Sequence, residues 1–159
     1  MRIAKFHAFI LAFVTAGTVW AMDTQRSAPA PAPAKDAALE QARAAIGSKD
    51  WAGAQNILRD AVARNPQNAD YHNLYAYSMR MGPNPSMDLV FRHYNEALRI
   101  DPKHRGAHEY LGEAYLMTGN VAKAKEHLAQ LDSICTFGCE EYTQLKNAVA
   151  AYEQQHAKK

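Results

Sequence analysis

The chain of 159 residues carries little net charge and lacks a long apolar run. Its 18 Lys and Arg residues against 16 Asp and Glu residues leave a net charge of +2. That charge is too small to indicate a nucleic-acid or membrane surface. With 48% apolar and 21% charged residues, the chain is neither disordered by composition nor a multi-span membrane protein. Its length corresponds to one domain of modest size, since domains usually have about 100–150 residues.

The sequence also lacks the motifs that mark common catalytic sites. It contains no Gly-x-Ser-x-Gly, no phosphate-binding loop, no His-Glu-x-x-His and no dinucleotide-binding fingerprint. The neighbouring carboxylates Glu140 and Glu141 are adjacent in the chain, so on a helix they point in different directions. They are better suited to a helix N-terminus, where acidic side chains interact favourably with the dipole. We therefore expect no enzymatic activity and no cofactor.

The first 21 residues have the order of a secretory signal peptide. A basic start with Arg2 and Lys5 precedes an apolar stretch over residues 6–19, and Val19-Trp20-Ala21 resembles a signal-peptidase site. The alternative is an uncleaved anchor helix, which needs about 20 apolar residues. Because this stretch is shorter and has polar interruptions, we predict cleavage near Ala21 and a soluble, exported, periplasmic protein. No cysteine follows the stretch, so we expect no bacterial-type lipid anchor.

Residues 22–35 form a linker rich in Ala and Pro. Pro29, Pro31 and Pro33 alternate with Ala, which disfavours helix and sheet and favours an extended, semi-stiff spacer. Cleavage after Ala21 would remove two basic residues and no acid, leaving 16 basic and 16 acidic residues. The mature chain is then formally neutral, so we expect neither nucleic-acid binding nor stable membrane insertion.

From residue 36 onward, helical patterns and turns recur at a regular interval. Asn65-Pro66 and Asp101-Pro102 occupy equivalent stops, 36 residues apart. The last unit is the clearest, with in-phase residues His108, Leu111-Gly112, Tyr115, Ala124 and Leu128. This pattern resembles the tetratricopeptide repeat, in which W-x2-L-G-x2-Y is followed by A-x3-F and P over about 34 residues.

Two earlier units follow the same pattern more loosely. The middle unit carries His72, Tyr75-Ala76, Met79, Val90 and Tyr94, and the first carries Ala38, Gln41-Ala42, Ala45, Ala54 and Leu58. The resemblance implies an all-α solenoid of three helix-turn-helix repeats over about residues 36–68, 69–104 and 105–134. About three repeats are the usual minimum for a stable array.

Small residues in the repeats predict close helix packing and helix ends. Ala42, Ala76 and Gly112 would let a partner helix approach closely, which a bulky side chain would prevent. Glycines fall where each first helix should end, a common place for this residue; these are Gly47, Gly82 and Gly119.

A capping helix is expected after the last repeat, because a solenoid needs a terminal unit with a polar outer face. Apolar residues recur at helical spacing between residues 140 and 155, namely Tyr142, Leu145, Val149 and Tyr152. Residues 135–159 are therefore predicted to form a Cys-containing turn, this helix and a frayed tail.

The two cysteines, Cys135 and Cys139, flank a short turn. In an exported chain with two cysteines, a disulfide is the expected state, and Gly138 permits the tight bend. The spacing differs from the Cys-x-x-Cys of redox motifs. A Cu(I) site with two thiolates is the alternative, because soft ligands suit this ion. The histidines and methionines form no dense metal-binding run, so we expect no metal ligands.

The resemblance also implies a concave groove lined by the first helix of each repeat. Its expected positions are Leu39, Arg43, Asn73, Tyr77, Arg80, Glu109, Glu113 and Leu116. The groove would be basic or apolar at the first repeat and acidic at the third, with Tyr77 as an aromatic anchor. One subfamily holds a C-terminal carboxylate with a Lys, Asn and Arg clamp. This sequence departs from that clamp, with Leu39 and Arg43 at its first two positions and glutamates nearby.

These features together predict a non-catalytic protein-interaction module, an adaptor or assembly factor that binds a protein or peptide partner in the periplasm. The alternative is a small periplasmic copper-handling protein that uses Cys135 and Cys139. The two hypotheses differ in whether these cysteines are bonded to each other or bind metal.

Overall fold

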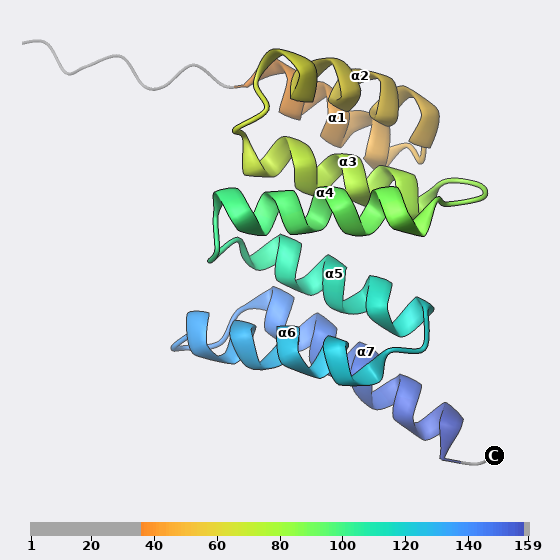
Figure 1. Cartoon of the computed structure of the whole chain (residues 1–159), viewed down its shortest axis with the longest axis vertical. Helices are drawn as coiled ribbons and strands as arrows, with labels where there is room; N and C mark the ends of the chain where they lie inside the picture. The colour runs from red at the N-terminus through yellow and green to blue at the C-terminus, as the bar shows by residue number, and fades with distance from the viewer. Residues whose placement is uncertain (1–35, 158–159) are drawn as a thin grey trace, which may run out of the picture. The chain divides into compact units, whose positions relative to one another are not determined.

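The computed structural model describes residues 36–157, so the predicted signal peptide and linker lie outside the described residues. This part of the chain forms seven α-helices: α1 (Ala37–Gly47), α2 (Trp51–Arg64), α3 (Ala69–Met81), α4 (Met87–Ile100), α5 (Arg105–Met117), α6 (Val121–Ile134) and α7 (Glu140–His156). The predicted all-α fold of helix hairpins with a C-terminal capping helix is confirmed (Figure 1). Between residues 36 and 157, no helix is both long and apolar enough to cross a membrane.

Most helices begin at a residue whose side chain accepts a hydrogen bond from the backbone of the first turn. Asp36, Asp50, Asn68 and Asn120 do this for α1, α2, α3 and α6, and each satisfies an amide that would otherwise lack a partner. His104 caps α5 through its ring, with Nδ1 accepting from the Ala107 amide at 3.1 Å. The sequence therefore specifies where the helices start by local chemistry.

The helix ends differ from the glycine pattern predicted from the sequence. Of the three glycines predicted at the ends of first helices, only Gly119 is left-handed, with φ of 79°. Gly47 is the last residue of α1, and Gly82 has φ of −75°. In the first repeat the left-handed residue is Lys49, with φ of 60°. Lys49 is equivalent to Gly119 of the third repeat, since the next residue makes the same backbone hydrogen bond in both. The Asp50 amide donates to the Ala45 carbonyl, and the Asn120 amide donates to the Tyr115 carbonyl. Those hydrogen bonds close the α1–α2 turn around a non-glycine residue.

The hairpins stack so that odd-numbered helices share one side. Each helix packs on its neighbours in the chain, and α1 also contacts α3, α3 contacts α5, and α5 contacts α7. Among the described residues, the even-numbered helices show no comparable contacts with one another. The odd helices are therefore closer together, and the array curves with these helices on its inner face.

The capping helix explains the small residue at Gly112. A Cβ atom placed on Gly112 would lie 2.6 Å from a methyl carbon of Leu145, which is in α7. The sequence predicted close approach of a partner helix there, and the structure identifies that helix as α7. Leu145 and Val149 are buried in a core cluster with Leu116 and Leu131. The cap thus closes the apolar end of the third hairpin.

Candidate functional site

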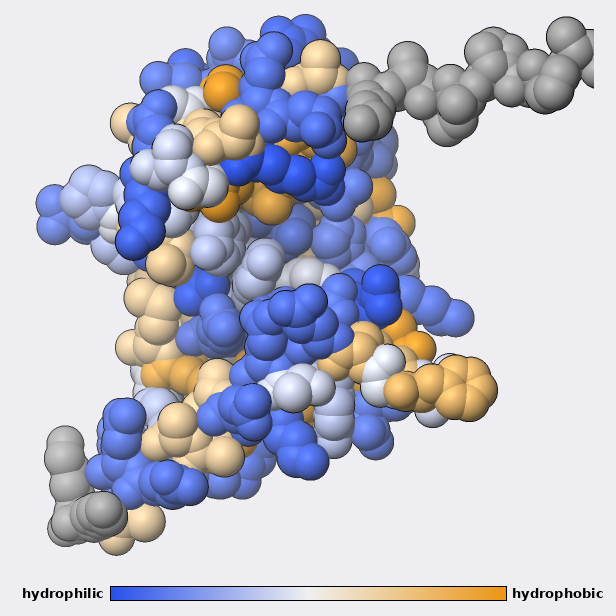
Figure 2. All heavy atoms as spheres, turned by 180° about the vertical axis from the view of Figure 1, so that it is seen from behind, coloured by the Kyte–Doolittle hydropathy of each residue, from blue (hydrophilic) through white to orange (hydrophobic). Residues whose placement is uncertain are grey.

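Two tyrosines and an ion pair form the centre of the inner face. We call Tyr77, Arg80, Tyr110 and Glu113 the groove cluster; the first two are in α3 and the last two in α5. The rings of Tyr77 and Tyr110 lie 4.7 Å apart, centroid to centroid, and both side chains are partly exposed. Figure 2 shows a face of the molecule that is hollowed midway along the stack, with residues of intermediate hydropathy in the hollow.

The buried Arg80 side chain contacts the other three members of the groove cluster. Its guanidinium carbon lies 5.5 Å from the Tyr77 ring centre and 5.8 Å from that of Tyr110, within cation–π range. It donates to Glu113 Oε2 at 2.7 Å and to the Tyr94 hydroxyl at 3.3 Å. Because the Arg80 side chain is only 5% exposed, it supports the surface from within the protein.

The floor beside the groove cluster contains two buried polar side chains. Asn73 in α3 and Glu109 in α5 are 4% and 3% exposed, and they occupy equivalent positions in the second and third repeats. Burial, with the Glu113 and Glu141 carboxylates nearby, raises the pKa of Glu109 to about 8. Glu109 is therefore mostly neutral at pH 7, and Glu113 is paired with Arg80. The negative charge predicted for this end of the groove is therefore largely neutralised.

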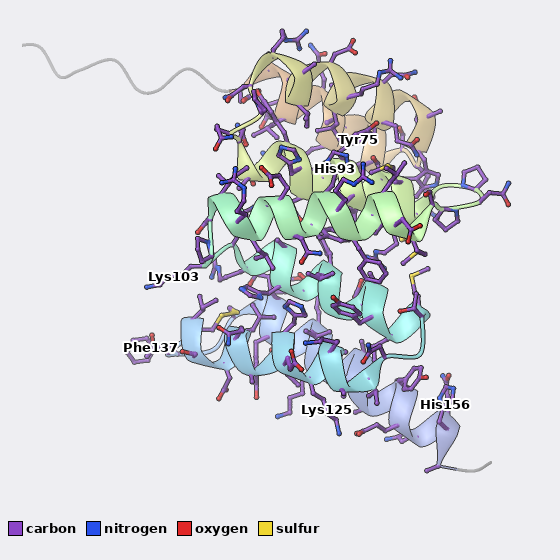
Figure 3. The ribbon with its side chains drawn as sticks, viewed as in Figure 1. Tyr75, His93, Lys103, Lys125, Phe137 and His156 are labelled. Carbon is purple, nitrogen blue, oxygen red and sulfur yellow. A yellow bond between two sulfur atoms is a disulfide. The ribbon has the colours of Figure 1, made fainter. Side chains whose placement is uncertain are left out.

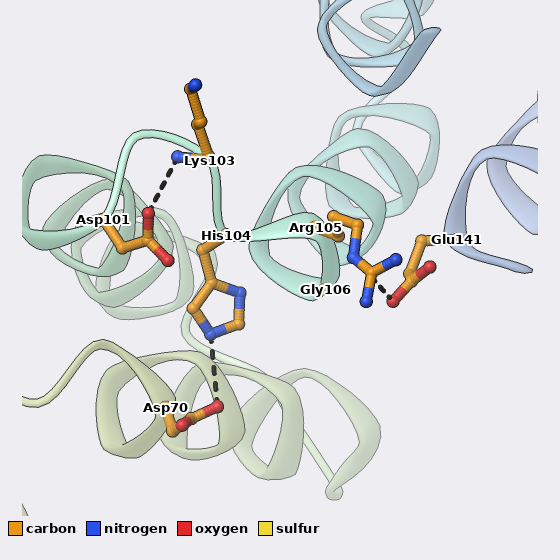
Figure 4. A pocket seen from close by; sticks show the side chains of 7 residues that line it. All are labelled: Asp70, Asp101, Lys103, His104, Arg105, Gly106 and Glu141. Carbon is orange, nitrogen blue, oxygen red and sulfur yellow. Dashed lines mark hydrogen bonds and ion pairs between the residues drawn. The ribbon is translucent and has the colours of Figure 1, made fainter. Parts of the chain in front are cut away.

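A hollow of about 280 Å³ opens at the N-terminal ends of α3 and α5. Its lining residues are Asp70, Asp101, Lys103, His104, Arg105, Gly106 and Glu141 (Figure 4). His104 Nε2 lies 3.3 Å from Asp70 Oδ1, and Arg105 Nε lies 3.6 Å from Glu141 Oε1. Hydrogen bonding from His104 lowers the pKa of Asp70 despite its partial burial. Carboxylates from α3, from the turn between α4 and α5, and from α7 thus meet at this hollow.

The structure places the eight predicted groove residues in four different environments. Tyr77, Arg80 and Glu113 are brought together in the groove cluster, and Asn73 and Glu109 lie in the floor beside it. Leu39 and Leu116 are 8% and 9% exposed and belong to core clusters. They are therefore not available as binding surface. Arg43 is exposed on α1 and lies 3.7 Å from Glu40.

Two aromatic residues of this surface do not follow from the repeat pattern. Tyr110 belongs to the groove cluster, and the partly exposed Trp51 packs edge-on against Tyr77 with ring centres 6.2 Å apart. Trp51 begins a second helix of a hairpin, whereas the repeat pattern places groove residues on first helices. Tyr110 directly follows Glu109, so a search for aromatics beside each groove position would have found it.

Two equivalent histidine pairs lie outside the groove. One pair joins α3 to α4 in the second hairpin, and the other joins α5 to α6 in the third. His72 Nε2 lies 3.0 Å from the Pro66 carbonyl, and its Nδ1 lies 2.9 Å from His93 Nδ1. The third hairpin has the same arrangement. His108 Nε2 lies 3.1 Å from the Pro102 carbonyl, and its Nδ1 lies 3.0 Å from His127 Nδ1. Because Nε2 must donate to the carbonyl, Nδ1 of the first histidine accepts from the second.

The second histidine of each pair, His93 or His127, is neutral at pH 7. Burial and the neighbouring His72 lower the pKa of His93 to about 4, and burial beside His108 lowers the pKa of His127 to about 4. Figure 3 shows His93 beside Tyr75, and their ring centres are 4.8 Å apart. The buried histidines therefore replace the usual Trp of the repeat with a hydrogen-bonded packing contact.

The two cysteines are bonded to each other. The Cys135–Cys139 disulfide joins residues with Cα atoms 5.6 Å apart, directly before α7. Neither sulfur atom is then a thiolate that could bind Cu(I), so the copper alternative lacks its ligand pair. In residues 36–157, no group of three or more His, Cys, Asp or Glu side chains is placed to hold a metal ion.

Helix hairpins stacked in register, with an inner face built from the first helix of each, define an α-solenoid repeat protein. Two profiles described as tetratricopeptide repeat match the sequence, over residues 39–84 and 90–149. The chain belongs to the tetratricopeptide repeat family. A comparison with curated protein sequences finds no match.

Solved structures with the same architecture share little sequence with this chain. The type III secretion translocator chaperone SycD of Yersinia enterocolitica has a TM-score of 0.65 at 14% identity, over 76% of this chain and 83% of that chain. The Sgt2 domain of Aspergillus fumigatus has a TM-score of 0.66 at 20% identity, covering 80% and 82%. The TPR2B domain of yeast Sti1 has a TM-score of 0.65 at 20% identity, over 74% of this chain and 94% of that chain. At these identities the similarity shows the fold alone.

Proposed function

We propose that this chain is a non-catalytic protein-interaction module that holds a segment of a partner protein against the groove cluster. The observation that carries the proposal is the pair of partly exposed tyrosines, Tyr77 and Tyr110, fixed by the buried Arg80. Rigid aromatic side chains of this kind often supply most of the energy of an interface. Because Arg80 is already positioned, a partner does not have to order these rings.

The solved relatives support binding of a protein segment by this fold. SycD has been solved in complex with a peptide of the translocator YopD, and the Sti1 domain in a complex with pHsp70. We propose a comparable role for this chain as an adaptor or assembly factor. Its partner is set by the groove residues of this sequence, since the fold alone does not define a ligand.

Truncating Tyr77 to alanine is expected to abolish partner binding. The test crosslinks the protein to its partner in cells and then isolates the complex by affinity capture. Tyr75→Ala is the matched control, because Tyr75 has the same side chain on the same helix but packs against His93. Affinity capture and mass spectrometry should recover the partner with wild type and Tyr75→Ala, but not with Tyr77→Ala. Equal recovery with all three proteins would exclude the groove cluster as the binding surface.

The Glu113→Lys change is unsuitable for this test, although Glu113 is a groove position. Its carboxylate is 2.7 Å from Arg80, so a lysine would place a second cation beside a buried guanidinium. The variant would lose stability as well as binding.

We propose further that the protein is exported to the periplasm and cleaved near Ala21. The order of residues 1–21 and the disulfide between Cys135 and Cys139 both support an oxidising compartment. Mass spectrometry of protein from the fractionated cell envelope should find a mature chain that begins at Met22, without free thiols. A full-length chain with two free thiols would contradict export.

A further inference from the structure

Each histidine pair has room for only one added proton while its hairpin is closed. His72 Nε2 donates to the Pro66 carbonyl at 3.0 Å, so in the neutral pair its Nδ1 is bare and accepts from His93 Nδ1 at 2.9 Å. A proton can be added at Nε2 of His93 without disturbing either hydrogen bond. A further proton on His72 Nδ1 would place two N–H groups face to face across 2.9 Å. The second protonation therefore requires the two helices to separate.

The third hairpin repeats this arrangement, whereas the first hairpin has apolar residues in its place. His108 Nδ1 lies 3.0 Å from His127 Nδ1. The equivalent positions in the first hairpin are Ala38 and Ile57, which pack against the apolar core cluster of α1 and α2. The first hairpin is therefore held closed at this position by contacts that do not titrate, and it serves as a reference within the same chain.

The surroundings of the first pair disfavour charge on the closed form. Burial, His72 and Arg92 lower the pKa of His93 to about 4, and Glu96 opposes them only in part. From α3, the Tyr75 ring lies 4.8 Å from the His93 ring, centroid to centroid. The closed pair thus gains its first proton only in strong acid.

The second pair has comparable surroundings. Its charged and titratable neighbours are Lys123 and Glu126 on α6, Tyr115 on α5, and Asp101 and His104 in the turn before α5. Glu109, which also lies on α5, has its charged neighbours on α3, α5 and α7, so separating α5 from α6 leaves those neighbours in place.

We propose that the two histidine pairs are acid-sensitive contacts that allow the second and third hairpins to open below about pH 6, while the first hairpin stays closed. Opening exposes both histidines of a pair to water, where an imidazole has a pKa near 6.5. An open pair therefore takes up more protons than a closed one, and acid favours the state that binds more protons. Separate opening is possible because each repeat of a solenoid contacts only its neighbours.

Opening of the second hairpin would also weaken the groove cluster. The Tyr94 hydroxyl on α4 accepts a hydrogen bond from Arg80 at 3.3 Å, and separating α4 from α3 removes this support. Acid should therefore release a segment held against Tyr77 and Tyr110. This release rests on the proposed function, whereas the opening itself does not.

Hydrogen exchange of the full chain, measured by mass spectrometry at pH 7 and pH 5, tests the opening. Each rate is divided by the rate of the same peptide in the unfolded chain, which removes the direct effect of pH on exchange. Protection of α3–α4 and α5–α6 should fall by about tenfold or more, since each extra proton contributes about tenfold for every pH unit below 6.5. Protection of α1–α2 should fall much less.

Variants of the second hairpin test the histidines directly. His72→Ala with His93→Ile introduces the residues of the first hairpin, so α3–α4 should lose its dependence on pH while α5–α6 keeps it. His93→Gln retains an N–H donor for His72 Nδ1 but removes one titrating group, so it should reduce the effect even if the double variant does not fold. His156→Gln makes the same change at an exposed site on α7 and should behave as wild type.

Three results would overturn the proposal. Equal loss of protection in all three hairpins would show that acid acts on the whole chain, and unchanged protection at pH 5 would show that the pairs tolerate acid. A loss in α3–α4 that persists in both variants at His93 would assign the effect to other groups. None of these measurements involves a partner, so the proposed function would still be decided by Tyr77→Ala.

Discussion

Replacing Arg80 by alanine should lower the free energy of unfolding by about 3 kcal/mol, because it removes one partner of a buried ion pair. Arg80 is the common donor to Glu113, the Tyr94 hydroxyl and Met117 Sδ. Without it, the fully buried Tyr94 loses a hydrogen bond and Glu113 is left unpaired. Urea unfolding followed by circular dichroism at 222 nm measures the change.

Further variants test whether charge or packing dominates the effect at Arg80. Arg80→Lys should recover only part of the loss, since one ammonium cannot reproduce the planar, multiple donors of a guanidinium. Arg80→Met combined with Glu113→Gln should recover most of it, because no unpaired charge remains. Arg99→Ala is the control, since its ion pair with Glu96 is exposed and should matter little. An Arg80→Ala protein as stable as Arg99→Ala would refute the structural role of Arg80.

The stability of the protein should be greatest near pH 6–7 and should fall on both sides. Glu109 has a pKa of about 8 in the folded chain and a model-peptide pKa near 4.3 when unfolded. The folded state thus holds a proton that the unfolded state has lost, so its stability decreases as pH rises toward 8. Between pH 6.5 and 8 the decrease should be about 2 kcal/mol, at 1.36 kcal/mol for each pH unit.

The acid side of this profile is set by the histidine pairs. His93 and His127 have pKa values of about 4 in the folded chain, against about 6.5 when unfolded. The unfolded state takes up protons first as pH falls, so the stability that these residues contribute is lost between pH 6.5 and 4. Two histidines outweigh the single opposing Glu109 in this range. Stability therefore rises with pH up to about 6.5.

Urea unfolding midpoints at pH 5, 6.5 and 8 test both sides. Glu109→Gln should remove the decrease between pH 6.5 and 8 and make the acid side steeper, because its opposing titration is gone. Glu126→Gln should reproduce the wild-type profile. A wild-type midpoint that is the same at pH 6.5 and 8 would show that Glu109 is already ionised in the folded protein.

The sequence alone determined the fold class and the helical repeat. Small residues, aromatics and prolines recur in phase, so the pattern carries the architecture without knowledge of any contact. The core positions of the cap were predicted for the same reason, since Leu145 and Val149 follow helical spacing and are buried. Helix starts are equally local, because a side chain such as Asp50 or Asn120 caps amides only three residues away.

Only the tertiary structure decided which groove positions are surface and which charges are free. Arg80 and Glu113 are 33 residues apart in the chain, and their pairing depends on the stacking of α3 against α5. Leu39 and Leu116 follow the groove pattern but are covered by neighbouring helices. Glu109 and Asn73 are ordinary polar residues in sequence, and burial alone makes them unusual. Desolvation and pairing depend on what packs nearby in space, and the periodicity of a single helix does not contain that information.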